Sequence, residues 1–430
     1  MFPSVLKRHP LATQTENEAI IPEPMVNKVT AKNVFKIFGE DPSPAFEMLR
    51  DGRSKAEILE KTGLTVGVND ASFEVAEGEI FVVMGLSGSG KSTLVRMING
   101  LIPPSGGEML IDDVDVVSCS AETLRSVRRD KIAMVFQHFA LFPHKTVVDN
   151  VAYGLKVKGV GVQERRERAL KALSQVGLEA WADSHPDELS GGMQQRVGLA
   201  RGLATEAEVL LMDEPFSALD PLIRRDMQEE LLELQRSLKK TIIFITHDLN
   251  EALILGDKIA IMKDGRFVQV GTAEDIVGAP ADDYVAAFTQ DIDRSRVFEV
   301  GSIAASPEAL DLSADTPRTA LDRMETHERN ALYVMDGANI AGVVTYRDAA
   351  VAARGDGGDL RAILRTDFST VSEDAYLHEL YDKAASGLPV AILDAGKAFV
   401  GVVAPQAIFA QLVRGEDDAA ASAEDRMARA

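Results

Sequence analysis

The sequence has only one cysteine, lacks a long apolar run and has fewer basic than acidic residues. Its one cysteine, Cys119, excludes an internal disulfide and a metal cluster held by cysteines, which fits a reducing compartment. No apolar run approaches the roughly 18 residues that span a bilayer. Acidic residues outnumber basic residues by 67 to 46, and the net charge of −21 disfavours a nucleic-acid partner. We therefore expect a globular protein, with two or three domains among its 430 residues.

Both ends of the chain have the composition of disordered segments. Residues 1–27 are polar, contain prolines and lack the apolar core of a signal peptide. Residues 415–430 are charged and rich in alanine, which is typical of a frayed helix or a flexible tail. The folded part of the chain is therefore expected between residues 28 and 414.

The first large segment, from residue 28 to about 280, alternates between strand and helix patterns. Helical patterns at 162–178 and 222–240 lie among strand-like runs, which are 81–84, 132–136, 209–212 and 241–245. This alternation predicts an α/β domain with a parallel sheet and crossover helices. Because the run 209–212 is apolar throughout, we expect a strand covered on both faces.

A phosphate-binding loop follows the strand that ends near residue 84. The motif "GLSGSGKST" has the spacing of a P-loop and stands between a strand and a helix. Its backbone N–H groups can surround a β-phosphate, the lysine can reach the β- and γ-oxygens, and the serine hydroxyl can bind Mg²⁺. The predicted nucleotide contacts are Gly85, Leu86, Ser87, Gly88, Ser89, Gly90, Lys91, Ser92 and Thr93.

Two carboxylates at the end of an apolar run indicate what happens to that phosphate. In "VLLMDEP", Asp213 stands where it can hold Mg²⁺ beside Ser92. Glu214 can then polarise a water for in-line attack on the γ-phosphate. The combination predicts a centre that hydrolyses the nucleotide.

A second anion-binding helix terminus occurs in "LSGGMQQR". Ser190, Gly191 and Gly192 open this helix, so its N–H groups and dipole can face a phosphate. One P-loop and one further phosphate-facing helix end suggest that two chains close on each nucleotide. At this point the sequence resembles the ATP-binding-cassette (ABC) ATPases, in which this signature caps the γ-phosphate on the partner's P-loop.

The resemblance extends to three further motifs in the order that the family has them. It implies that Gln137 in "MVFQHFALFPH" touches Mg²⁺ and the attacking water, while its loop faces the membrane subunit. It implies that Asp220 in "SALD" lies at the dimer seam and that His247 in "FITHD" holds the γ-phosphate and orients water with Glu214. By position, Phe38 in "KIFGE" is the aromatic side chain that stacks on adenine, although the segment 41–65 after it is longer than in most cassettes.

More narrowly, the sequence resembles the ATPases of glycine betaine/proline uptake. The segment before the P-loop, "MVFQHFALFPHKTVVDNVAYGL" and "ALDPLIRRDMQEELLELQ" carry this likeness. A weak internal repeat relates "ALYVMDGANIAGVVTYRDAAVAA" to "PVAILDAGKAFVGVVAPQAIFAQ" and matches the tandem cystathionine-β-synthase (CBS) module of these ATPases. The implied fold is a P-loop NTPase, with a RecA-like parallel sheet and with β and α-helical subdomains, followed by an α+β CBS pair. The expected domains are 28–280 (ATPase), 281–296 (linker), 297–355 and 356–414 (CBS repeats).

The implied function is ATP hydrolysis that drives import of a quaternary amine or proline-type osmoprotectant. The implied partners are a second copy of the chain, two permease subunits and a substrate-binding protein. The permease would hold the chain peripherally at the cytoplasmic face of the inner membrane. A choline importer is the near alternative, and an ATPase acting on a soluble partner is the more distant one. DNA-repair and translation ATPases fit less well, because sustained heptads, a second cassette and positive charge are all missing.

The CBS module is expected to regulate the ATPase rather than to catalyse. The first repeat reads "GVVTYRD", in which Thr345 and Asp348 stand where such repeats hold an adenine nucleotide. The second repeat has Ala404 and Ala407 in their place, so at most one nucleotide site of this kind is predicted. Two alternatives to a nucleotide site remain open: the repeats are purely structural, or they sense ionic strength. A sensor of ionic strength is physically reasonable because contacts between surface charges weaken as the salt concentration rises.

Overall fold

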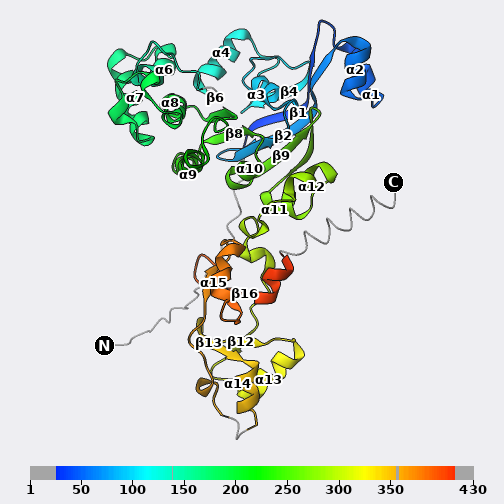
Figure 1. Ribbon diagram of the computed structural model, residues 1–430, viewed down its shortest axis with the longest axis vertical. Helices are drawn as coiled ribbons and strands as arrows, with labels where there is room; N and C mark the ends of the chain where they lie inside the picture. Colours follow the sequence, from blue (N-terminus) through cyan, green and yellow to red (C-terminus); the bar gives the residue numbers. More distant parts are fainter. Residues whose placement is uncertain (1–25, 138, 355–357, 412–430) are drawn as a thin grey trace, which may run out of the picture.

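The computed structural model describes residues 26–137, 139–354 and 358–411. Elements up to α12 (Asp283–Thr289) form the upper body in Figure 1, and strands β11 to β16 form the lower one. The predicted disordered tail and all but two residues of the predicted disordered lead lie outside the described residues. The two-part layout agrees with an ATPase domain followed by a CBS module.

A six-stranded sheet forms the centre of the upper body, in the order β10-β9-β3-β8-β7-β6. Its strands are β3 (Ile80–Met84), β6 (Ile132–Phe136), β7 (Val209–Asp213), β8 (Thr241–Thr246), β9 (Lys258–Lys263) and β10 (Arg266–Gly271). All neighbours are parallel except β10, which pairs antiparallel with β9. The predicted parallel sheet is confirmed, and every residue of β3 and β7 is buried, as expected of strands covered on both faces.

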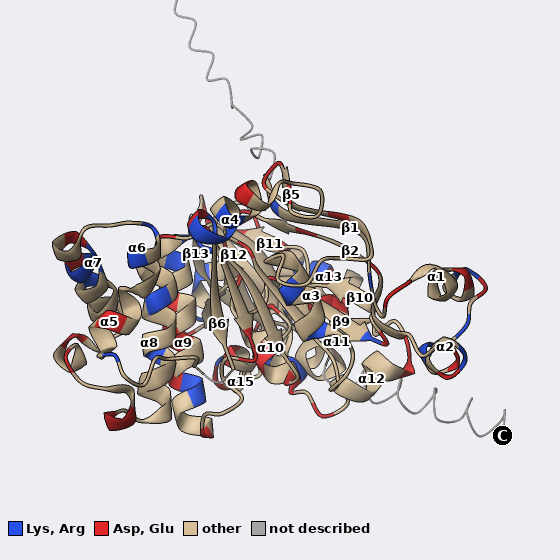
Figure 2. Cartoon of the chain, turned by 90° about the horizontal axis from the view of Figure 1, so that it is seen from above, with Lys and Arg blue, Asp and Glu red and all other residues tan. Residues whose placement is uncertain are grey.

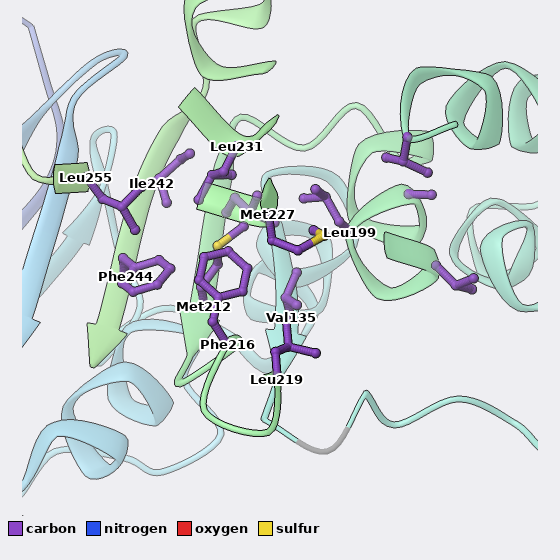
Figure 3. Packing of buried hydrophobic residues seen from close by; sticks show 14 of the residues in the cluster. Val135, Leu199, Met212, Phe216, Leu219, Met227, Leu231, Ile242, Phe244 and Leu255 are labelled. Atoms are coloured by element: carbon purple, nitrogen blue, oxygen red, sulfur yellow. The ribbon is translucent and has the colours of Figure 1, made fainter. Parts of the chain in front are cut away.

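Alternate side chains of β3 enter two different cores. Phe81 and Val83 pack with α3 (Lys91–Ile98) and with a second, antiparallel sheet. Ile80 and Val82 belong to the larger core on the opposite face, beneath α8 to α10. Figure 3 shows this larger core, where Met212 and Phe244 of the sheet meet Met227 and Leu231 of α9. These two layers fix the carboxyl ends of the parallel strands.

Helices of the upper body surround the central sheet. They are α4 (Ala121–Asp130), α5 (Val147–Val151), α6 (Tyr153–Val157), α7 (Val162–Gln175), α8 (Gly191–Ala204), α9 (Pro221–Leu238), α10 (Leu249–Leu255), α11 (Ala273–Gly278) and α12. The helices predicted at 162–178 and 222–240 are confirmed as α7 and α9. Short 3₁₀ turns, Glu179–Trp181 and Pro186–Glu188, lead into α8.

The antiparallel sheet has the order β2-β1-β4-β5 and carries a helical insertion. Its strands are β1 (Asn27–Phe38), β2 (Thr65–Ala76), β4 (Gly106–Ile111) and β5 (Val114–Asp115). Between β1 and β2 the chain forms α1 (Ser43–Arg50) and α2 (Lys55–Thr62), which project from the body in Figure 2. A capping box of Ser54 and Glu57 starts α2, and Gly63 ends it in the left-handed conformation. Ile58 anchors α2 in a small core of its own.

The lower body consists of two three-stranded sheets with the same topology. The first contains β11 (Ala309–Asp311), β12 (Ala331–Asp336) and β13 (Asn339–Thr345), with α13 (Pro317–Thr326) and α14 (Tyr346–Ala352). The second contains β14 (Thr370–Ser372), β15 (Val390–Leu393) and β16 (Phe399–Val403), with α15 (Leu380–Ala384). In each sheet the first two strands are parallel and the last two antiparallel. The internal repeat inferred from the sequence is therefore a structural repeat.

The segment 281–296, expected as a linker, is folded against the ATPase domain. It contains α12 and a 3₁₀ turn, Arg294–Arg296. Val285 is fully buried in the larger ATPase core, because α12 presents an apolar face that must leave water. Beyond it, Phe298 shares a core with Val277 of α11 and with β15 and β16 of the second repeat. The second repeat thus lies between the ATPase domain and the first repeat (Figure 1).

Candidate ATPase site

The P-loop contains glycines at positions where a Cβ atom would collide with neighbouring backbone. Any other residue at these positions would therefore displace that backbone. A Cβ at Gly85 would lie 2.1 Å from the Met262 carbonyl oxygen, and Gly85 has φ +152°. A Cβ at Gly90 would lie 2.4 Å from the Gly67 carbonyl oxygen, at φ +111°. The strand β9 and the start of β2 therefore enclose the loop from two sides.

Lys91, the first residue of α3, is held against its own loop. Its Nζ donates to the carbonyl oxygens of Gly85 at 2.7 Å and Leu86 at 3.2 Å. Burial lowers the pKa of this ammonium, and Glu214 and Asp213 act in the opposite direction. A cation kept in a poorly solvated loop, with carboxylates nearby, is suited to meet phosphate oxygens.

Asp213 and Ser92 meet as the sequence predicted. The Ser92 Oγ donates to Asp213 Oδ1 at 3.0 Å, across 121 positions of sequence. Burial raises the pKa of the Asp213 carboxyl, although the bond from Ser92 lowers it in part. Arg96 stands 4.0 Å from the other carboxylate oxygen.

Glu214 and His247 also come together, because β7 and β8 are neighbours whose carboxyl ends share one edge. The His247 Nδ1 lies 3.1 Å from Glu214 Oε2. Glu214 adopts a left-handed backbone conformation with φ 48°, and its N–H donates to the Ile245 carbonyl at 3.0 Å. Its other oxygen lies 3.9 Å from the Lys91 ammonium. The carboxylate therefore stands between the P-loop lysine and the histidine.

Gln137, at the end of β6, reaches the same edge through a serine. Its Nε2 donates to the Ser217 Oγ at 3.3 Å, and Ser217 donates to the Glu214 carbonyl at 3.0 Å. Ser217 opens the "SALD" motif, which predicts no role for this serine. Its position three residues after Glu214 was the only signal for this bridge.

A cavity of about 500 Å³ runs along this edge. Its lining contains the end of β1, α2, the start of β2, the P-loop and the acidic edge, with the residues Phe38, Lys55, Ala56, Leu59, Thr65, Val66, Gly67, Ser87, Gly88, Gly90, Lys91, Ser92, Thr93 and Glu214. Phe38 therefore lies in the same cavity as the P-loop, as expected, and is 39% exposed. The cavity joins an aromatic end to a phosphate-binding end.

The signature residues stand apart from this cavity. Ser190 caps α8 and accepts a bond from the Met193 N–H at 3.4 Å. Gly191 is exposed, whereas Gly192 is buried against Ile223, to which a Cβ would approach within 2.5 Å. Asp220 caps α9 through the Ile223 N–H at 3.1 Å. None of these four residues lines the cavity of its own chain.

A tyrosine from the expected linker contacts the P-loop, although no sequence motif indicates it. The Tyr284 hydroxyl accepts a bond from the Leu86 N–H at 3.5 Å, and Lys263 lies 4.5 Å from the centre of the tyrosine ring. Burial is the main cause that raises the pKa of this hydroxyl. No local pattern marks a residue 198 positions away as a neighbour of the loop.

Comparisons with known proteins decide the family. The ABC transporter model matches residues 68–217, and the CBS domain model matches residues 302–355. The glycine betaine transport ATP-binding protein OpuAA of Bacillus subtilis is 50% identical over 90% of this chain and 92% of its own length. The glycine betaine/proline betaine transport system ATP-binding protein ProV of Salmonella typhimurium is 50% identical over 91% and 98%. This chain belongs to the ABC transport ATP-binding proteins.

A solved structure agrees with this family. The chain titled cbiO1 from Clostridium perfringens, part of the ABC transporter complex cbiONQ, superimposes with a TM-score of 0.50 at 26% identity. The match covers 59% of this chain and 92% of that one. It supports the P-loop NTPase fold of the upper body. None of the helices among the described residues is long and apolar enough to cross a membrane.

The residues present fit a magnesium ion that arrives with nucleotide. Mg²⁺ prefers hard oxygen ligands and commonly takes one or two carboxylates or hydroxyls together with substrate phosphates. The adjacent oxygens of Ser92 and Asp213 provide that partial set. Across the part of the chain that the structure describes, no group of three or more His, Cys, Asp or Glu could hold a metal. In this ABC ATPase the phosphates would have to complete the coordination.

Thr345 and Asp348 of the first CBS repeat are engaged by each other and by Arg365, which follows that repeat. Thr345 caps α14, and its hydroxyl donates to Asp348 at 2.8 Å. Arg365 donates to the same carboxylate at 2.8 Å and is the largest cause that lowers its pKa. Between the two repeats, Tyr333 is buried and its hydroxyl donates to the Pro389 carbonyl at 2.6 Å.

Proposed function

We propose that this chain is the ATP-hydrolysing subunit of an importer for glycine betaine or a related quaternary amine. The single observation that carries this proposal is the likeness to the glycine betaine relatives, which extends over 90% of the chain and therefore includes the CBS module. The choline transport relative OpuBA of Bacillus subtilis is 44% identical over only 55% of the chain, which favours a betaine over choline. The chain itself would not contact the solute.

The geometry supports a specific division of roles in hydrolysis. Lys91 and the P-loop N–H groups would hold the β- and γ-phosphates, and Ser92 with Asp213 and Gln137 would hold Mg²⁺. Bound Mg²⁺ supplies neutralisation of charge on the phosphate oxygens. Glu214 would accept the proton of the attacking water, while His247 orients that carboxylate and contacts the γ-phosphate.

The proposed assembly is a dimer of this chain beneath two permease subunits. Ser190, Gly191, Gly192 and Asp220 would complete the site of the partner chain, since they do not line their own cavity. The loop after Gln137 would receive the permease. A substrate-binding protein would deliver the solute, and the permease would hold the ATPase at the cytoplasmic face of the inner membrane. The CBS pair would set activity in response to a nucleotide or to ionic strength.

Replacement of the proposed base tests this function. The change Glu214→Gln should leave ATP binding intact and lower hydrolysis about 10²–10⁴-fold, the usual cost of losing a general base. ATP binding and ATPase rate would be measured with the permease in liposomes, with glycine betaine supplied outside or omitted. Hydrolysis within a few-fold of wild type would contradict the role of Glu214, and hydrolysis indifferent to every quaternary amine would contradict the transport function.

A further inference from the structure

The nucleotide cavity has a wall that the P-loop motifs do not account for. Three of its lining residues, Lys55, Ala56 and Leu59, come from α2, the insertion between β1 and β2. They occur at positions i, i+1 and i+4, so one face of the helix borders the cavity. The base-stacking candidate Phe38 ends β1 just before this insertion and lines the same cavity.

Leu59 is an unexpected residue for an exposed position on this helix. Its side chain is 50% exposed, whereas Ile58, its neighbour in sequence, is completely buried in the core that anchors α2. The insertion therefore does not need Leu59 for its own packing. An apolar side chain that borders a ligand cavity in this way gains by covering an apolar or aromatic surface.

Phe38 is fixed in place as the other apolar wall. A Cβ on Gly67 would lie 2.8 Å from the edge of the Phe38 ring, so the glycine lets the ring lie close to β2. Lys36 lies 5.2 Å from the ring centre and is tied to the Pro103 carbonyl at 2.8 Å. The ring is thus positioned before any ligand arrives, and it lines the same cavity as Leu59.

Lys55 adds a positive charge at this end of the cavity. The side chain is partly buried, which lowers the pKa of its ammonium, and the charge of Asp264 opposes this effect. Within residues 26–137, 139–354 and 358–411, its ammonium makes no ion pair. Lys91 serves the other end of the cavity, beside Glu214. Lys55 and Lys91 are the two cationic residues of the lining, so a nucleotide in the cavity has a second ammonium available besides that of the P-loop.

We infer that α2 forms the second half of the nucleotide-binding cleft, with Leu59 covering the adenine face opposite Phe38 and Lys55 pairing with the α-phosphate. This inference rests on the proposed ATPase site and extends it with two residues. It gives the insertion between β1 and β2 a role in nucleotide affinity.

The test measures nucleotide binding to the full chain in a Glu214→Gln background, which prevents turnover. Leu59→Ser should weaken ATP binding about fivefold, because roughly one apolar contact is lost. It should leave binding of inorganic tripolyphosphate unchanged, since that probe has no base. Lys55→Met should weaken ATP and ADP equally, also about fivefold at low salt, and less at 1 M salt, where charges are screened. The exposed Glu60, on the same helix but outside the cavity lining, provides the matched control Glu60→Gln.

The outcomes separate this inference from the proposed function. ATP affinities of Leu59→Ser and Lys55→Met within twofold of the control would overturn the inference, provided that Phe38→Ala and Lys91→Ala lose binding. An equal loss of tripolyphosphate binding in Leu59→Ser would also overturn it, because the effect would then be indirect. Normal ATP binding in Phe38→Ala and Lys91→Ala would instead contradict the proposed site itself. Circular dichroism and the melting temperature of each variant establish that the chain as a whole is folded.

Discussion

Asp213 and Glu214 are adjacent in sequence but occupy different environments. Asp213 is the last residue of β7, and its side chain is only 10% exposed. Glu214 leaves the strand with a positive φ and meets His247 of the neighbouring strand end. The change in backbone conformation between the two residues assigns one carboxylate to Ser92 and the other to the histidine.

The buried carboxylate of Asp213 should cost stability in the absence of nucleotide. Burial raises its pKa, so the native state binds the proton more tightly than the unfolded state. The penalty is therefore absent in acid, below the unfolded pKa of about 4, and complete once pH exceeds the raised native pKa. We expect Asp213→Asn to raise the melting temperature at pH 7.5, and the gain to shrink towards zero near pH 4. Thermal unfolding across this pH range measures the effect.

The ligand response of the same variant provides its control. Mg²⁺–ATP should stabilise the wild type more than ATP with a chelator, and this difference should vanish in Asp213→Asn. A melting temperature that falls at pH 7.5 would show that the carboxylate stabilises the fold and would contradict the prediction.

Most of the site residues could be predicted because strand ends concentrate them. Ser92 and His247 follow β3 and β8, and Asp213 ends β7. Because these three strands lie side by side in a parallel sheet, the meeting of the residues follows from the fold class. Tyr284, which bonds to the P-loop, and Leu59, which lines the same cavity, could not be placed there from the sequence. Their contacts depend on how α12 and α2 dock, and docking angles leave no local pattern in a sequence.

At the scale of elements, α8 presents its N-terminus to solvent rather than to its own P-loop. Gly191 is exposed there, and a Cβ would have nothing nearer than 3.9 Å. Gly192 is packed on Ile223, so its replacement would also push α8 from α9. The structure therefore makes Gly191 the better position for a lesion that acts only across the proposed dimer.

A mixed dimer tests whether α8 acts on the partner's nucleotide. One chain carries Lys91→Ala, the other carries Gly191→Asp, and both carry Glu214→Gln to retain ATP. Both lesions then fall in one composite site, so we expect one trapped ATP per dimer. The ATP that stays bound is counted after gel filtration. Because this readout measures binding and not turnover, the result does not depend on whether hydrolysis at one site is coupled to hydrolysis at the other.

The matched control places both lesions on one chain and pairs it with an otherwise unmodified Glu214→Gln chain. Each composite site then carries one lesion, and we expect no trapped ATP. The reverse result, no trapped ATP in the mixed dimer and one in the control, would mean that α8 serves its own chain. Equal retention of one ATP by both arrangements would mean that Gly191 does not face nucleotide.

Helices and strands differ in how well the sequence predicts them. The capping box "SKAE" and Gly63 would have predicted α2 within the segment that the sequence analysis noted only for its length. The fold of residues 281–296 was harder to predict, because α12 is only seven residues long. The apolar residues of so short a helix show no clear pattern until their packing against the core is known. Short helices of this kind are stabilised by packing rather than by propensity.

For the whole molecule, the core shared across the domain boundary is the main new feature. Phe298 is 5% exposed and packs with Val277 of the ATPase domain and with the second CBS repeat. Phe298→Ala should cost about 3 kcal/mol, in the range for a buried aromatic residue. Because Phe298 packs against both domains, its replacement should lower the temperature at which ATPase activity is lost.

An equally buried residue of the first repeat is the control for this prediction. Leu310 is 1% exposed and belongs to a core without ATPase residues. Leu310→Ala should destabilise the first repeat and leave the inactivation temperature of the ATPase unchanged. If both variants shift that temperature equally, the whole chain unfolds as one unit; if neither does, the shared core carries no stability of the ATPase domain. Deleting everything after residue 295 would remove every buried member of this core except Val277, so a point variant is the cleaner probe of the CBS module.

The strand order of the central sheet also governs how the chain is made. The strand β3 emerges early from a ribosome, yet its sheet neighbours β8 and β9 lie beyond residue 240. At typical rates of synthesis the fully apolar β3 waits on the order of ten seconds for them. During this time β3 can pack only against α3 and the antiparallel strands that have already been synthesised, and these cover one of its two faces. The other face, Ile80 and Val82, stays open until translation of the ATPase domain is nearly complete, and the newborn chain is therefore most vulnerable to aggregation before its nucleotide site exists.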